Sequence, residues 1–190
     1  MRLNLRGLLT VVLICLVGAT AFHADAQQNR ASITSVYTNT GGKGCRTIEY
    51  LKETGDIVQS CPGIAGYKLE IADSDARMSV TVVAPGGLKS ELNYWNVITH
   101  AFSSVGDKAE WRVRKVNGKV VPVALIVRVN ASENPEAPGK MVSYLAVAKV
   151  TPQKSCVTEK IAPSATANEE ARRAADSAAR KPCLEQTLPE

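Results

Sequence analysis

Histidine is scarce in this sequence of 190 residues, in which only His23 and His100 occur. The sequence also lacks the nucleophile-elbow, phosphate-loop, dinucleotide, zinc-protease and EF-hand motifs. His23 lies in the segment that we interpret below as a signal peptide. Without these motifs, base-assisted catalysis would therefore have to use His100 or carboxylates. We therefore expect a non-catalytic protein with no cofactor and no bound metal. A hydrolase that uses paired carboxylates is the alternative, and the candidate acids are Asp56, Glu70, Asp73, Asp75, Glu91, Asp107 and Glu110.

Long hydrophobic runs are also missing, because no segment reaches the roughly twenty residues that a membrane-spanning helix needs. A shorter apolar run over residues 8–17 follows Arg2 and Arg6 and precedes the Ala-Asp-Ala sequence at residues 24–26. This order is typical of a secretory signal peptide over residues 1–26, with cleavage after Ala26. An uncleaved N-terminal anchor is the alternative. We expect a periplasmic or secreted mature chain that does not span a membrane.

Neither sign of charge dominates, since 23 basic and 18 acidic residues give a formal net charge of +5. The basic residues are scattered rather than grouped, and nucleic-acid binding needs a concentrated basic surface. We expect no nucleic-acid partner. The scattered charges indicate a solvated sheet face, and a surface that meets a weakly acidic partner is the alternative.

Cysteine is infrequent and its spacing is irregular, with no C-x-x-C pair. Apart from Cys15 in the expected signal peptide, an even number remains, which predicts two disulfides in an oxidising compartment. Three pairings are possible for Cys45, Cys61, Cys156 and Cys183. We favour Cys45–Cys61, which would close a hairpin, and Cys156–Cys183, which would hold the end of a helix.

Short β-like segments separated by turn residues extend over residues 33–161. The clearest turn is Asn117-Gly118 between two apolar-rich segments, a pattern that favours a two-residue hairpin. Counting back from this turn pairs Val113 with Pro122 and Trp111 with Ala124. Because proline lacks an N–H donor, a third strand on the outer side should begin after Pro122 or bulge there.

The C-terminal segment indicates a helix. Residues 166–169 (T-A-N-E) fit a capping box, and Pro182 would stop the helix. Small residues recur at helical spacing and would allow close packing on a sheet, at Ala171, Ala174, Ala175 and Ala178. A frayed tail is the alternative.

Together these patterns predict an α+β fold with an antiparallel, meander-rich sheet or half-closed barrel and a C-terminal helix tethered by a disulfide. After the signal peptide, we expect a β-rich domain over residues 27–162. The helix and tail of residues 163–190 would pack on the same domain.

Aromatic residues make up 5% of the chain and gather in its middle third. A place in the core is the ordinary interpretation of such a cluster. The alternative is that Asn93, Tyr94 and Trp95 form a loop that meets a protein or a cell-envelope glycan, together with Arg112. A non-catalytic binding or inhibitory module is the function we favour, and an envelope structural or stress factor is a further alternative.

The order of several short motifs resembles a group of small exported alphaproteobacterial proteins that has no established activity. The motifs are S-V-Y-T at residues 35–38, C-P-G at 61–63 with G-Y at 66–67, G-D-K-A-E-W-R at 106–112 and A-N-E-E-A-R-R-A-A at 167–175, together with Cys45, Cys156 and Cys183. The resemblance implies export and disulfide bonds, and it implies no activity or functional residues.

Overall fold

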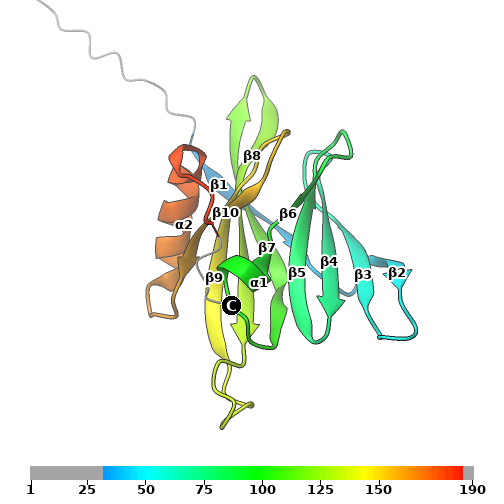
Figure 1. Cartoon of the computed structure of the whole chain (residues 1–190). Helices are drawn as coiled ribbons and strands as arrows, with labels where there is room; N and C mark the ends of the chain where they lie inside the picture. Colours follow the sequence, from blue (N-terminus) through cyan, green and yellow to red (C-terminus); the bar gives the residue numbers. More distant parts are fainter. Residues whose placement is uncertain (1–31, 186–190) are drawn as a thin grey trace, which may run out of the picture. The chain divides into compact units, whose positions relative to one another are not determined.

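The computed structural model describes residues 32–185, which form an open antiparallel sheet with one C-terminal helix (Figure 1). The strands are β1 (Thr34–Asn39), β2 (Arg46–Tyr50), β3 (Ile57–Pro62), β4 (Lys68–Ser74), β5 (Arg77–Val83), β6 (Lys89–Glu91), β7 (Ser103–Val116), β8 (Lys119–Ala131), β9 (Val142–Lys149) and β10 (Cys156–Ile161). The helices are α1 (Tyr94–Val97), α2 (Ala167–Ser177) and the short 3-10 helix η1 (Ala178–Arg180). The predicted α+β class is confirmed, and the sheet is open rather than closed into a barrel.

The sheet has the strand order β10-β9-β8-β7-β5-β4-β3-β2, with β1 beside β7 and β6 beside β5. Every pairing is antiparallel except the contact between β5 and β7, a single parallel bridge from Arg77 to Ser103. The sheet therefore consists of two antiparallel halves that meet at one narrow connection.

The predicted hairpin at Asn117-Gly118 is present, and Val113 lies opposite Pro122 as expected. The pairing of Trp111 with Ala124 is wrong, because a β-bulge at Val123 shifts the register and places Trp111 opposite Leu125. The bulge has a physical reason. Trp111 and Leu125 both belong to the main core, and a shift of one residue would turn one of the two strands to the opposite face.

Strand β9 pairs with β8 only from Ala124 onward, as the missing donor of Pro122 requires. The segment after Pro122 is buried on both faces, which explains its nearly continuous apolar sequence. Leu125, Val127 and Val129 enter the main core, whereas Ala124 and Ile126 face the helix.

The main core lies between the two halves of the sheet. Leu69 and Ile71 of β4 and Val80 and Val82 of β5 share one cluster with Trp111 of β7 and with residues of β8 and β9. Since alternate residues of a strand point to opposite faces, the other face of β4 and β5 is directed away from this core.

Helix α2 covers the opposite face of β8 and β9 (Figure 1). The predicted alanine stripe is buried, with Ala171, Ala174 and Ala175 on α2 and Ala178 at the start of η1. The predicted capping box is absent: Thr166 has φ −105° and ψ 4° and makes no side-chain cap. An N-cap residue needs an extended backbone for its side-chain oxygen to accept from the first free N–H groups of the helix. Thr166 does not have this backbone conformation, and its hydroxyl donates to the Glu170 carboxylate instead.

Both preferred disulfides are present, Cys45–Cys61 and Cys156–Cys183. They are bonds typical of proteins that fold in an oxidising compartment. Within residues 32–185, no helix has the length and hydrophobicity needed to cross a membrane. The expected signal peptide and its cleavage site lie outside the described residues.

Candidate functional site

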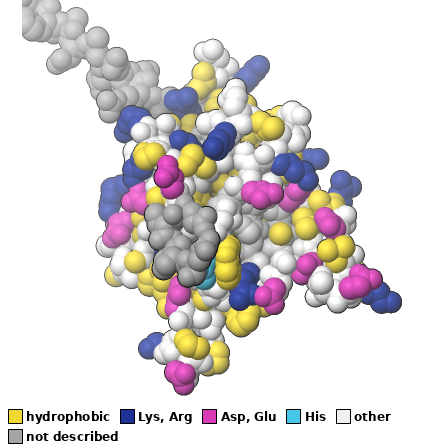
Figure 2. Space-filling view, viewed as in Figure 1, with side chains coloured by type: hydrophobic (Ala, Val, Ile, Leu, Met, Phe, Trp, Pro, Cys, Tyr) yellow, Lys and Arg dark blue, Asp and Glu magenta, His cyan; other side chains and the backbone are white. Residues whose placement is uncertain are grey.

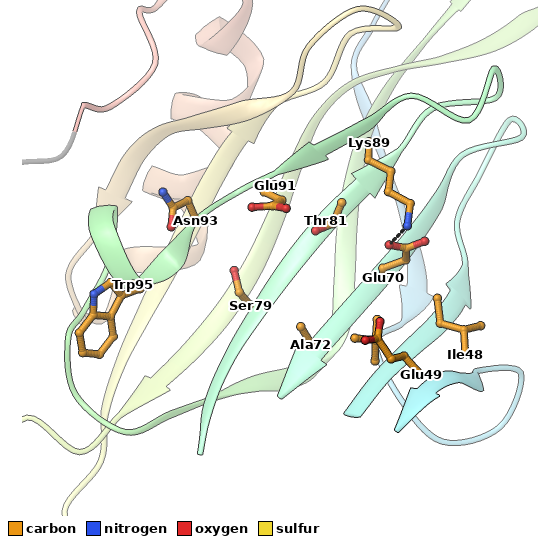
Figure 3. A pocket seen from close by; sticks show the side chains of 11 residues that line it. Ile48, Glu49, Glu70, Ala72, Ser79, Thr81, Lys89, Glu91, Asn93 and Trp95 are labelled. Carbon is orange, nitrogen blue, oxygen red and sulfur yellow. Dashed lines mark ion pairs between the residues drawn. The ribbon is translucent and has the colours of Figure 1, made fainter. Parts of the chain in front are cut away.

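The outward face of the β2–β6 half contains a depression of about 370 Å3 (Figure 3). Its floor is built from alternate residues of two neighbouring strands, Glu70 and Ala72 on β4 and Ser79 and Thr81 on β5. Glu70 pairs with Thr81 and Ala72 pairs with Ser79 in the antiparallel register. These side chains are mostly short, so the sheet surface is hollow there.

Strand β2 forms one end of the depression. A β-bulge lies between Thr47 and Glu49, so that Ile48 has no direct partner on β3. A bulge bends its strand and redirects side chains, and the consecutive residues Ile48 and Glu49 both line the depression here. A regular strand would direct them to opposite faces.

The other end is formed where β6 leads into α1 (Figure 3). Asn93 has φ 51° and ψ 53°, a left-handed conformation that asparagine tolerates better than most residues. The resulting turn directs the next two aromatic side chains differently. Tyr94 is 1% exposed and lies in the core, whereas Trp95 is 42% exposed and lines the depression.

The charge of the depression is mainly negative. Glu49, Glu70 and Glu91 line it together with a single lysine, Lys89. The Lys89 Nζ atom lies 2.8 Å from a carboxylate oxygen of Glu70, so this cation is already paired. The site therefore has an excess of carboxylates beside the hydroxyls of Ser79 and Thr81 and the amide of Asn93.

Trp95 is held by neighbours outside the depression. Its ring stacks on His100 with 4.5 Å between the ring centroids, and the Arg77 guanidinium lies 4.8 Å from its centroid. Arg77 also lies 4.4 Å from the ring centroid of Phe102. These contacts fix the orientation of the indole. They also give His100 a packing role in support of Trp95.

The four residues predicted as a binding site do not form one surface. Asn93 and Trp95 both line the depression. Tyr94 is a core residue, so its predicted place on the binding surface is wrong, and burial raises the pKa of its hydroxyl. Arg112 is 8% exposed and pairs with Asp176 of α2, so it joins the helix to the sheet instead of facing a partner.

Most of the depression could not be predicted from the sequence, because its residues come from the successive strands β2 to β6 and the start of α1, and only the pairing register of these strands brings the side chains to one face. Glu70 and Glu91 were among the candidate acids, and the register now places both of them opposite Thr81 on its two sides. Glu49 was not a candidate, and only the bulge in β2 accounts for its position. Among the described residues, no group of three or more His, Cys, Asp or Glu side chains is arranged to hold a metal ion.

Charge is mixed on the face of the molecule that Figure 2 shows. On the face seen in Figure 2, basic and acidic side chains are interspersed. This fits the scattered charges of the sequence.

Fold and site together define a disulfide-bonded α+β protein with an open sheet and a polar depression on the outer face of one half. Comparison with known protein families, with curated proteins and with solved structures finds no match to this chain.

Proposed function

We propose that this chain is exported to the periplasm and acts there as a non-catalytic binding module for an envelope protein or glycan. The depression on the outer face of β2–β6 is its binding site. Tyr94 and Arg112 are not part of this site, because both are buried.

Export is supported by two independent features. The signal-like order of residues 1–26 is one, and the two disulfides are the other, since such bonds persist in oxidising compartments. The resemblance to small exported alphaproteobacterial proteins supports the same location.

One observation carries the binding function: the depression combines Trp95 with several hydrogen-bonding side chains on a sheet. Binding sites commonly combine an aromatic contact with a few well-placed polar groups. Here Ser79 and Thr81 lie within a strand and Trp95 is fixed by stacking. The site therefore needs little ordering when a ligand binds, which favours affinity.

The test is retention of ligands by the oxidised chain beginning at Gln27. Purified cell-wall sacculi and a periplasmic protein extract are the two ligand sources. The binding variant carries Trp95→Ala and Glu91→Lys, and the matched control carries Glu136→Lys in an exposed loop. We expect a ligand that the wild type and the control retain and that the binding variant loses. Equal retention by all three folded proteins would contradict the proposed site.

A carboxylate-based hydrolase is the second candidate, favoured by the presence of Glu70 and Glu91 in one depression. Glycoside hydrolysis uses two carboxyl groups on either side of the scissile bond. The test is release of soluble fragments from sacculi by the wild type and by Glu70→Gln and Glu91→Gln variants. Release that both substitutions abolish would establish this alternative, and no release by the folded wild type would exclude it for this substrate.

A further inference from the structure

We propose that the open edge of β2 accepts an extended segment of a partner protein as an added antiparallel strand, and that a lysine or arginine of this segment enters the depression. The inference rests on the proposed function, since it names the partner class for the same site. It favours a protein over a glycan as the ligand.

Strand β2 ends the sheet and has one neighbour, β3. All five of its residues are exposed. The Leu51 N–H donates to the Asp56 carbonyl across the hairpin, over 2.9 Å. Because donor direction alternates along an antiparallel strand, the N–H and C=O of Tyr50 are directed to the open side. These groups are free to pair with another strand.

The other end of the sheet is covered differently. Leu184 donates its N–H to the carbonyl of Val157 on β10, over 2.8 Å, and the adjacent Cys183 is bonded to Cys156. The C-terminal segment thus occupies part of the β10 edge. Within residues 32–185, no comparable backbone contact is made on the open side of β2.

The open edge also carries large apolar side chains. Ile48 is 45% exposed, Tyr50 is 61% exposed and Leu51 is 45% exposed. An exposed strand edge with apolar side chains is prone to pair with another chain, and proteins use such edges to bind extended peptides. In that mode the backbone supplies affinity and the side-chain pockets supply specificity.

The negative charge of the depression indicates that the side chain entering it is basic. Glu49 stands at the β2 end of the depression, and Glu70 and Glu91 lie further along it. The only lysine in the lining is paired with Glu70. A basic side chain that leaves an added strand beside β2 would face this excess of carboxylates, whereas an acidic one would be repelled. The short side chains of Ala72 and Ser79 leave room for it.

The bulge at Ile48 limits the length of the added ladder. It interrupts regular pairing in β2 after Thr47 and leaves the Glu49–Tyr50 end regular. We therefore expect contact to centre on Tyr50, with Ile48 and Glu49 directed to the depression.

The test uses two synthetic peptides of alternating threonine and valine, one with a central lysine and one with a central glutamate. Binding to the oxidised chain beginning at Gln27 is followed by amide chemical shifts and by hydrogen exchange. Tyr50→Pro removes the donor on the open side, and Tyr50→Thr is its matched control. Glu49→Lys reverses one charge, and Glu136→Lys makes the same change in an exposed loop. Thermal unfolding of each variant reports whether it folds.

We expect the lysine peptide to bind and to protect the Tyr50 amide from exchange. The glutamate peptide and the Glu49→Lys variant should each weaken binding by about fivefold to tenfold. The Tyr50→Pro variant should lose binding that Tyr50→Thr retains. If Tyr50→Pro does not fold, protection of the Tyr50 amide in the wild type shows whether this N–H pairs with the added strand.

Failure to bind either peptide would overturn strand addition, and equal binding of both would overturn the role of charge. Retention of sacculi that depends on Trp95 and Glu91, without peptide binding, would overturn this inference and leave the proposed function intact. Loss of both kinds of binding in a folded protein would overturn the two proposals together.

Discussion

Arg112 of β7 and Asp176 of α2 form an ion pair with two hydrogen bonds, although 64 positions separate them in the sequence. The Nε–Oδ1 distance is 2.8 Å and the Nη2–Oδ2 distance is 3.0 Å. Arg112 also donates to the hydroxyl of Ser35 and to the carbonyl of Ile33. One guanidinium thus links the helix, the sheet and the segment at the start of β1.

Replacing Asp176 with alanine should therefore loosen the helix. The Asp176→Ala variant leaves a buried guanidinium with fewer partners, and we expect the free energy of unfolding to fall by about 2 kcal/mol. Chemical denaturation measures this change. Arg173→Ala, at an exposed position of the same helix, is the control, with an expected change within about 0.5 kcal/mol. Equal effects of the two substitutions would contradict the linking role of Arg112.

Glu110 should make stability depend on acid pH. Burial alone would raise the pKa of its carboxyl, but hydrogen bonds from Arg172 and Ser35 and the charge of Arg172 hold that pKa below the ordinary value of 4.5. Because the folded-state pKa is the lower one, ionised Glu110 stabilises the folded protein above pH 4.5. This contribution should disappear as the pH falls through the lowered pKa.

The measurement is the free energy of unfolding between pH 6 and pH 2 for the wild type and for Glu110→Gln. We expect a difference of about 1 kcal/mol at pH 6, since Arg172 is partly exposed, and convergence of the two proteins at low pH. A constant difference across the range would show that ionisation of Glu110 is not involved.

The Cys156–Cys183 bond should stabilise α2 selectively. Replacing both cysteines with serine removes a cross-link between residues that are 27 positions apart. In the chain-entropy model we expect the free energy of unfolding to fall by about 3 to 4 kcal/mol. Hydrogen exchange should accelerate most in α2, whose small side chains bury little area. The Cys45→Ser, Cys61→Ser variant is the matched control and should leave exchange in α2 unchanged. Uniform acceleration in both variants would contradict this prediction.

Gly63 should be intolerant of any side chain. A Cβ atom there would lie 2.7 Å from the Tyr67 carbonyl oxygen and 2.9 Å from Trp111 Cζ2. Trp111 is fully buried and cannot move without repacking the core, so we expect Gly63→Ala to cost about 2 kcal/mol. Gly86→Ala is the control, because no atom lies within 4 Å of its added Cβ. Thermal unfolding followed by Trp fluorescence compares the stability of the two variants. Equal stability would contradict the predicted clash.

Much of the sheet could be predicted because its signals are local. Asn117-Gly118 dictates a turn by its own backbone preferences, and Pro122 prevents pairing by lacking a donor. The pairing of Trp111 could not be obtained by counting from the turn. It depends on which residues of two strands must share a face, and this requirement is met by the bulge at Val123.

The site was harder to predict because it depends on how the strands β2 to β6 are aligned with one another. Adjacent aromatics such as Tyr94 and Trp95 look alike in a sequence, and only the left-handed turn at Asn93 decides which one enters the core. Arg112 looked like a surface cation, since the sequence does not reveal that α2 returns to cover it. Glu70 on β4 and Glu91 on β6 lie on the same face because both pair with Thr81 on the strand between them.

The order of the disulfides has a consequence for biogenesis. Each bond joins cysteines that follow one another along the chain after Cys15, and neither loop encloses a cysteine of the other bond. A polypeptide that is threaded N-terminus first into an oxidising compartment would present Cys45 and Cys61 as a pair before Cys156 arrives. In a chain that enters such a compartment in this way, oxidation in order of emergence would give the native connectivity without an isomerase to reshuffle mispaired thiols.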